Sequence, residues 1–147
     1  MIKPLSDFLK HIAELSSRMD HYKKKRDPVD LNKVHVELIG DYKGGKFWLV
    51  DGTYIRDEID EDFIGGGNPG RYSYVPENEF WIEKVMVLKD QLCTMVHEFV
   101  EWEKMTGKHW SYDKAHEYAL GIEKNLRNNM PNQGSLMSDF VFSIENK

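Results

Sequence analysis

The sequence predicts an α+β fold, in which helices and strands occupy separate parts of the chain. Apolar residues recur at helical spacing near the N-terminus, alternate with polar residues in the middle, and return to helical spacing after about residue 86. We divide the 147 residues, read as one domain, into an N-terminal helix within 1–30, a strand region over 33–84, a helix pair over 85–129 and a tail over 130–147. We expect a small, mostly antiparallel sheet packed against an antiparallel helix pair, with the N-terminal helix as a further element.

The first helix is expected over residues 4–26. Pro4 suits an early helical position, and Asp27-Pro28 ends the helix because the residue before a proline avoids helical dihedral angles. One face carries the apolar residues Leu5, Phe8, Leu9, Ile12 and Leu15 at helical spacing.

The strand region begins with a predicted hairpin. KVHVELIG (33–40) and KFWLVDG (46–52) have a period of two, and DYKGG between them is typical of a turn.

Further strands are expected after the hairpin, over residues 53–64, 72–76 and 79–84. The first of these is strongly acidic, which indicates a solvated edge with Arg56 paired to one of its acids. GGGNPGR (65–71) is expected to be a flexible connection. Its functional alternative is a mobile lid or a strand edge beside an active site.

Two helices follow the strands. The first is expected over 85–105 and ends near Gly107, and the second runs over 112–129 with Ser111 as its N-cap. The loop between them is short, so the two helices should pack as antiparallel neighbours. LMSDFVFSIE (136–145) is expected to add a last strand.

Composition and charge exclude several classes of protein. The net charge of −5 argues against non-specific nucleic-acid binding. No apolar run approaches the length of about 18 residues that a membrane span needs. Cys93 is the single cysteine, so no internal disulfide is available and an oxidising compartment is not required. We therefore expect a cytoplasmic protein that binds neither nucleic acid nor membrane.

The segment HEFVE (97–101) is the strongest candidate for chemistry. His97 and Glu101 are four residues apart and share one face of a helix, so both can reach one metal ion. Zinc accepts carboxylate oxygen as well as imidazole nitrogen. Glu98 follows the first ligand, the place of the general base in H-E-x-x-H enzymes. The same residues also fit an ordinary charged helix with a hydrogen-bonded core histidine.

The second helix offers the third ligand that a catalytic zinc needs. His116 is the preferred ligand. Glu123 lies seven residues further on the same face and is expected to accept a hydrogen bond from a ligand imidazole. His109, in the loop, is an alternative to His116.

Such a site would activate water and polarise a carbonyl, with Glu98 taking the proton of the water. Tyr112, Tyr118 and Arg56 are candidates to stabilise an oxyanion or contact the substrate, and the sequence does not choose among them.

The helix pair HEFVEWEKMTGKHWSYDKAHEYALGIEKNLR resembles the H-E-x-x-E…A-H-x-x-A pairing of small zincin-like proteins of phages and prokaryotes. The preceding VDGTYIRDEIDEDFIGGG…YSYVPENEFWIE is also similar to the strand region of that group, so the resemblance covers about residues 48–127. It implies a metal-dependent, peptidase-like hydrolase on a minimal zincin scaffold, with roles for His97, Glu98, Glu101 and His116. Glu101 departs from the usual histidine. The group is also expected to carry a histidine after its Gly-Gly pair. This chain has Gly67-Asn68-Pro69-Gly70 there instead, so any ligand at that place is lost.

A second hypothesis is a non-catalytic protein-binding module on the same scaffold, with a structural metal or none. The two hypotheses differ in the metal coordination. A catalytic metal leaves one position open, whereas a structural metal is closed by a fourth protein ligand such as His109 or Glu123.

Overall fold

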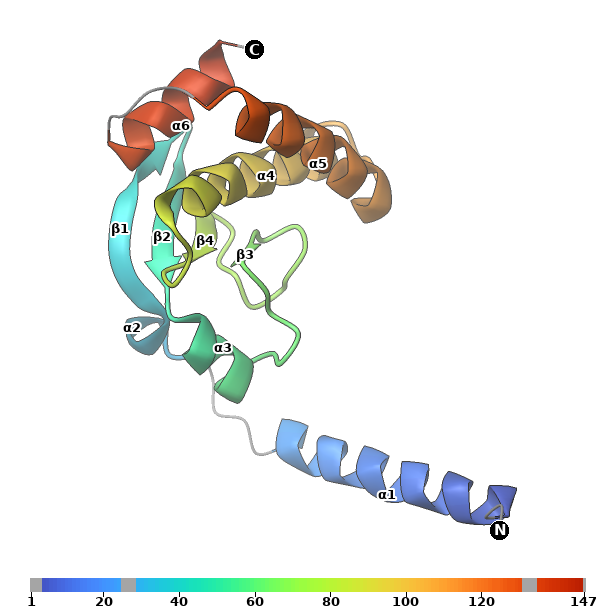
Figure 1. Cartoon of the computed structure of the whole chain (residues 1–147). Coiled ribbons are helices and arrows are strands. Elements are labelled where there is room, and N and C mark those ends of the chain that lie inside the picture. Colours follow the sequence, from blue (N-terminus) through green and yellow to red (C-terminus); the bar gives the residue numbers. More distant parts are fainter. Residues whose placement is uncertain (1–3, 25–28, 131–134, 147) are drawn as a thin grey trace.

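The structure, a computed structural model, describes residues 4–24 (side chains to residue 15), 29–130 and 135–146. The fold is α+β, as predicted (Figure 1). Its elements in chain order are α1 (Leu5–Lys24), α2 (Leu31–Val34), β1 (His35–Tyr42), β2 (Gly45–Val50), α3 (Gly52–Glu58), β3 (Gly66–Gly67), β4 (Glu79–Glu83), α4 (Leu88–Gly107), α5 (Tyr112–Asn128) and α6 (Leu136–Glu145).

The four strands form one mixed sheet in the order β1-β2-β4-β3. β1 and β2 are the predicted antiparallel hairpin, turned by Lys43 and Gly44, whose φ values of 49° and 82° suit a tight hairpin turn. β3 also pairs antiparallel with β4. β2 and β4 run parallel, because the chain crosses over through α3 and β3 between them.

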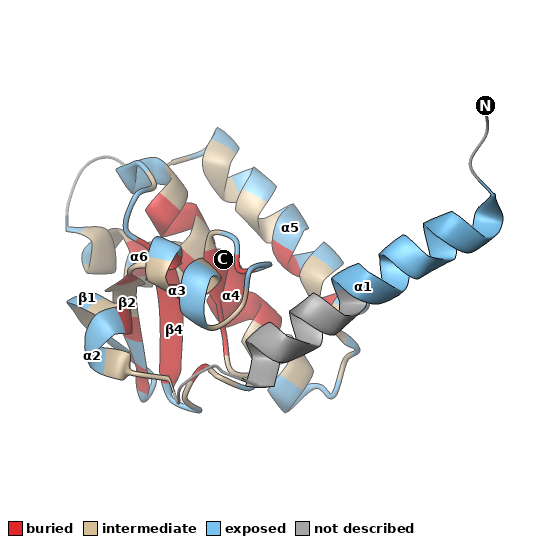
Figure 2. Cartoon of the chain, turned by 90° about the horizontal axis from the view of Figure 1, so that it is seen from below, coloured by how far each residue is buried: buried red, intermediate tan, exposed pale blue. Residues whose placement is uncertain are grey.

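Both faces of the central strand β4 are covered. Phe80 and Ile82 pack with residues of α4 and α6, whereas Trp81 points to the other face and packs with Val34, before β1, and Ile55 of α3. All five residues of β4 are buried, and Figure 2 shows β4 and the inner side of α4 as the main buried elements. This near-continuous apolar pattern is typical of a strand covered on two sides.

The strand predicted over 53–64 is wrong. The Asp51 side chain accepts a hydrogen bond of 3.1 Å from the backbone N–H of Tyr54 and caps α3, which buries Ile55. The strand predicted over 72–76 is also wrong, because this segment forms turns in which the N–H of Tyr72 bonds to the carbonyl of Asn68 (3.0 Å). The strand predicted over 79–84 is confirmed as β4.

The tail is a helix, not the predicted strand. Ser135 caps α6 by accepting a hydrogen bond of 3.1 Å from the N–H of Ser138. Phe140 is fully buried, and four partly buried apolar residues of the same helix pack against its cluster: Leu136, Met137, Val141 and Ile144. The segment therefore follows a helical period, and α6 covers α4 and the end of β1.

The predicted N-terminal helix is confirmed as α1, and its expected end at Asp27-Pro28 lies outside the described residues. α1 stands apart from the rest of the chain in Figure 1, and its apolar stripe is exposed, from 71% at Leu5 to 39% at Leu15. Across the described ranges, every helix is too short or too polar to cross a membrane.

Candidate metal centre

Helix α4 places three ionisable residues in the protein interior. His97, Glu98 and Glu101 are all buried, on a helix whose other buried residues are apolar except for Gln91. His97 and Glu101 are one turn apart, so their side chains share a face, as the sequence predicts. Buried charged groups are costly unless they are paired or bind a metal, so the residues around them decide what this cluster is.

Helix α5 supplies the other half of the cluster. Ser111 caps it as predicted, accepting a hydrogen bond from the N–H of Lys114. His116 lies beside Glu101 and Glu123 lies beside His97. The later residue of α5 therefore meets the earlier residue of α4, which makes the two helices antiparallel neighbours.

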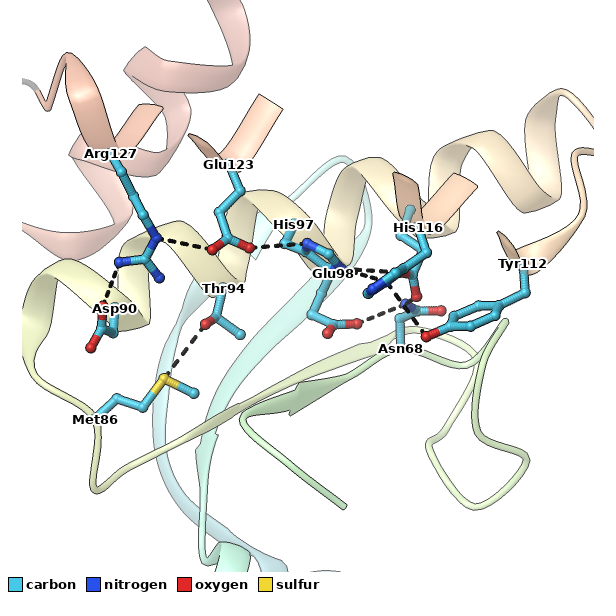
Figure 3. A network of polar contacts seen from close by, with 11 residues as sticks. Asn68, Met86, Asp90, Thr94, His97, Glu98, Tyr112, His116, Glu123 and Arg127 are labelled. Carbon is cyan, nitrogen blue, oxygen red and sulfur yellow. Dashed lines mark hydrogen bonds and ion pairs between the residues drawn. The ribbon is translucent and has the colours of Figure 1, made fainter. Parts of the chain in front are cut away.

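Three potential ligand atoms converge between the two helices (Figure 3). His97 Nε2 lies 3.0 Å from Glu101 Oε2 and 3.2 Å from His116 Nδ1. His116 Nδ1 lies 2.7 Å from Glu101 Oε2. Two imidazole nitrogens and one carboxylate oxygen thus form a small triangle.

The triangle fits zinc. With ligand bonds of about 2.0–2.1 Å in tetrahedral geometry, neighbouring ligand atoms lie about 3.3 Å apart. The observed separations of 3.0, 3.2 and 2.7 Å are all somewhat shorter than this, the last by the most. Two histidines and one glutamate also form a common ligand set for catalytic zinc.

The group is open on the side of α5. The side chain of His116 is 38% exposed, whereas those of His97 and Glu101 are 8% and 3% exposed. Within the described ranges, the group of potential metal ligands consists of His97, Glu101 and His116, and includes neither His109 nor Glu123. The described potential ligands therefore number three, one fewer than the four protein ligands that close a structural zinc site.

Glu123 lies behind His97, in the place expected for a supporting acceptor. Its Oε1 lies 3.1 Å from His97 Nδ1. This is an ion-pair contact whose angles do not meet those of a hydrogen bond. Its Oε2 accepts a hydrogen bond of 3.0 Å from Arg127 Nε, and Arg127 also donates to Asp90 (2.6 Å). This chain of contacts fixes the carboxylate that holds the imidazole ring.

Asn68 joins the general-base candidate to a ligand. Its Nδ2 donates to Glu98 Oε2 (2.7 Å) and to Glu101 Oε1 (3.1 Å). Its Oδ1 accepts from the backbone N–H groups of Gly70 (3.0 Å) and Arg71 (3.1 Å). Asn68 is fully buried and uses both amide hydrogens and both lone pairs, so the orientation of its amide is fixed.

The GGGNPGR segment is therefore an ordered part of the site and not a flexible connection. Gly66 and Gly67 form β3, the edge strand beside α4, in agreement with the strand-edge alternative. A Cβ on Gly66 would lie 2.6 Å from Thr94 Cγ2 and 2.8 Å from the Trp81 carbonyl oxygen. Only glycine lets this strand approach the helix so closely.

The electrostatics of the cluster follow from its buried carboxylates. Burial and the neighbouring Glu101 raise the pKa of Glu98 to about 7. Burial alone would lower the pKa of His97, but contacts with Glu101 and Glu123 outweigh it and raise this pKa to about 10. Burial opposes ionisation of Glu101, yet its contacts with His97 and His116 hold its pKa below the ordinary value. The cluster therefore favours a cation, either a proton or a metal ion.

The other predicted site residues lie in different places. Tyr112 belongs to the centre, because its hydroxyl is 3.5 Å from His116 Nδ1. Arg56 binds Glu83 through both guanidinium arms (2.9 and 2.7 Å), instead of an acid of its own segment. Tyr118 is exposed and packs edge-on against Trp110. His109 is an exposed loop residue.

Asn68 was not predicted as a functional residue from the sequence, where its position counted only as that of a lost ligand. The signal was present, since a polar residue directly after the Gly-Gly pair stands where the resembling group is expected to have a ligand. Arg71 was missed as well. Its guanidinium carbon lies 4.3 Å from the ring centre of Tyr112, at the edge of the centre.

Comparisons of the chain with protein-family models, curated proteins and solved structures found no match. The resemblance to zincin-like proteins therefore stays an expectation from the sequence pattern.

Proposed function

We propose that the protein is a zinc-dependent hydrolase of peptidase type. His97, Glu101 and His116 bind the metal, and Glu98 is the general base. The observation that carries the proposal is the convergence of three ligand atoms from two helices within 3.2 Å, beside a buried fourth ionisable group. A charged helix face without a function has no reason to bury and converge these side chains.

Zinc, when bound, supplies a Lewis acid that activates water and polarises a substrate carbonyl. Glu98 takes the proton from the attacking water and passes it to the leaving group. Asn68 Nδ2 donates to Glu98 Oε2, so we assign this proton transfer to the other carboxylate oxygen, Oε1. A pKa near 7 suits a group that both accepts and donates a proton at neutral pH.

Tyr112 is the best-placed of the three predicted oxyanion candidates. Its hydroxyl lies beside a ligand nitrogen, 3.5 Å from His116 Nδ1, and it comes from the first turn of α5. A phenol in this position can donate a hydrogen bond to the oxygen of a carbonyl under attack. Arg56 and Tyr118 have no such contact with the group.

The open side of the centre favours a hydrolase over a structural metal site. A structural zinc would need a fourth protein ligand, and neither predicted candidate lies in the group. A peptide or protein is the substrate we propose, and a cytoplasmic location remains the expectation drawn from the lone cysteine.

A paired measurement of zinc content and peptide hydrolysis tests the proposal. Zinc-loaded wild type should cleave members of a mixed peptide library, and Glu98→Gln should keep its zinc but lose the cleavage. Glu117→Gln removes an exposed carboxylate of α5 outside the group and should leave both unchanged. Turnover that persists in Glu98→Gln would remove the base from the mechanism.

A further inference from the structure

Arg71 differs from the other arginines whose side chains the structure describes. Arg56 is bound to Glu83, and Arg127 to Asp90 and Glu123. No described acid forms an ion pair with Arg71, which is exposed. Its guanidinium lies over aromatic rings, 4.3 Å from the ring centre of Tyr112 and 5.2 Å from that of Tyr72.

Arg71 is tied to the candidate centre in two ways. Its backbone N–H donates to Asn68 Oδ1 (3.1 Å), and the same Asn68 amide holds Glu98 and Glu101. Its side chain rests on Tyr112, whose ring also stacks on the His116 imidazole with ring centres 5.2 Å apart. The Tyr112 ring therefore connects the guanidinium to a proposed ligand. An extended peptide of about two to three residues is long enough to cover the distance from the guanidinium to that ligand.

The chemistry of this position selects one kind of ligand group. A guanidinium presents donors in a planar fork that matches a carboxylate with two parallel hydrogen bonds. The contact with the Tyr112 ring restricts the Arg71 side chain, so less entropy is lost on binding. The nearby carboxylates of Glu98 and Glu101 are buried and already bonded to Asn68.

We propose that Arg71, held by Tyr112, binds a carboxylate of the substrate, so that the enzyme prefers peptides with a carboxylate close to the scissile bond. This inference rests on the proposed zinc-dependent hydrolase function. The carboxylate is either the C-terminus of a peptide or the side chain of an aspartate or glutamate, since both offer the same pair of oxygens.

The binding of hydroxamates to the zinc-loaded protein tests this inference without turnover. The hydroxamate group binds zinc, and a series of straight-chain hydroxamates can carry a terminal carboxylate at increasing distance from it. Each is compared with its uncharged primary amide by calorimetry. We expect one chain length at which the carboxylate binds roughly tenfold more tightly than the amide.

Variants distinguish the contribution of Arg71 to the carboxylate preference from that of positive charge in general. Arg71→Gln should remove the preference for the carboxylate, and Arg71→Lys should keep part of it because the charge remains but the fork is lost. Lys114→Gln removes a nearby charge that lies over Trp110 (4.1 Å), and it should leave the preference intact. Zinc content should be equal in all of these proteins.

The outcomes distinguish the two proposals. If the hydroxamates bind but the carboxylate gives no preference at any length, the Arg71 inference is overturned and the zinc site stands. If the protein holds no zinc and binds no hydroxamate, both proposals fail. Peptide hydroxamates that carry the carboxylate as a free C-terminus, or as an aspartate side chain before a C-terminal amide, then identify which source Arg71 binds.

Discussion

Asn68 and Glu98 are joined by a hydrogen bond of 2.7 Å between Nδ2 and Oε2, although 30 residues separate them in the sequence. The second amide hydrogen of Asn68 reaches Glu101, so one side chain fixes both the proposed base and a proposed ligand. The loop that carries Asn68 is thereby part of the centre.

Loss of the Asn68 amide should weaken zinc binding. Asn68→Ala leaves Glu101 without one of its supporting partners, and such losses typically cost about 10- to 100-fold in metal affinity. Competition with a chromogenic chelator measures this affinity. Asn125→Ala, at an exposed position of α5, is the control and should have no effect. Equal affinities for Asn68→Ala and wild type would mean that the amide does not support the ligand.

A methyl group on Gly66 should destabilise the protein by about 1–3 kcal/mol, the usual cost of overpacking. It would lie 2.6 Å from Thr94 Cγ2 and 2.8 Å from the backbone oxygen of Trp81. A second substitution, Thr94→Ser in the Gly66→Ala protein, should restore only part of the stability, because the contact with the Trp81 carbonyl oxygen remains. Gly107→Ala, which meets nothing within 4 Å, is the control in urea unfolding. A Gly66→Ala protein as stable as wild type would contradict the close approach of β3 and α4.

Glu123 should matter to zinc affinity even though it is not a ligand. Glu123→Gln removes the charge that lies 3.1 Å from His97 Nδ1, and about a tenfold loss of affinity is expected. Asp90→Asn is the matched control, because Asp90 contacts Arg127, whereas the carboxylates paired with His97 are those of Glu101 and Glu123. The same loss in both variants would indicate a general effect of the Arg127 cluster.

The Arg56–Glu83 ion pair should make stability depend on pH. Hydrogen bonds from Arg56 hold the pKa of Glu83 below its ordinary value, against the effect of burial. A carboxyl group whose pKa is lower in the folded than in the unfolded protein stabilises the fold at any pH above the ordinary glutamate pKa of about 4.3. This stabilisation is lost as the pH falls through the lower pKa of the folded protein. The free energy of unfolding of wild type should exceed that of Glu83→Gln by about 1–2 kcal/mol at pH 7. This figure allows for the partial exposure of Arg56, which weakens the ion pair. Urea unfolding at several pH values measures the difference, which should shrink below about pH 4. A constant difference down to pH 3 would contradict this account.

The helix pair could be predicted because its signals are local. His97 and Glu101 share a face by spacing alone, Ser111 is a local cap, and the short loop fixes the antiparallel neighbours. The α3 and α6 helices were missed although their caps, Asp51 and Ser135, are also local. Both segments also carry alternating apolar residues and β-favouring side chains, which predicted strands, whereas packing against the rest of the fold favours helices.

The role of the GGGNPGR loop could not be derived from spacing. The contacts of Asn68 with α4 depend on β3 lying at the edge of the sheet beside that helix. Glycines that allow a close approach look, in sequence, the same as glycines of a flexible connection. Arg56 illustrates the same limit, since its partner Glu83 lies on a strand and outside the acidic segment next to it.

The zinc content of the purified protein shows whether His97, Glu101 and His116 bind a metal ion. Elemental mass spectrometry would be applied to chains without a polyhistidine tag, each shown to be folded by circular dichroism. We expect about one zinc per chain in wild type and in His109→Asn, which changes an exposed histidine outside the group, and none in His97→Ala. Absence of zinc from wild type after incubation with the metal, or its retention in His97→Ala, would show that this group is not a zinc site.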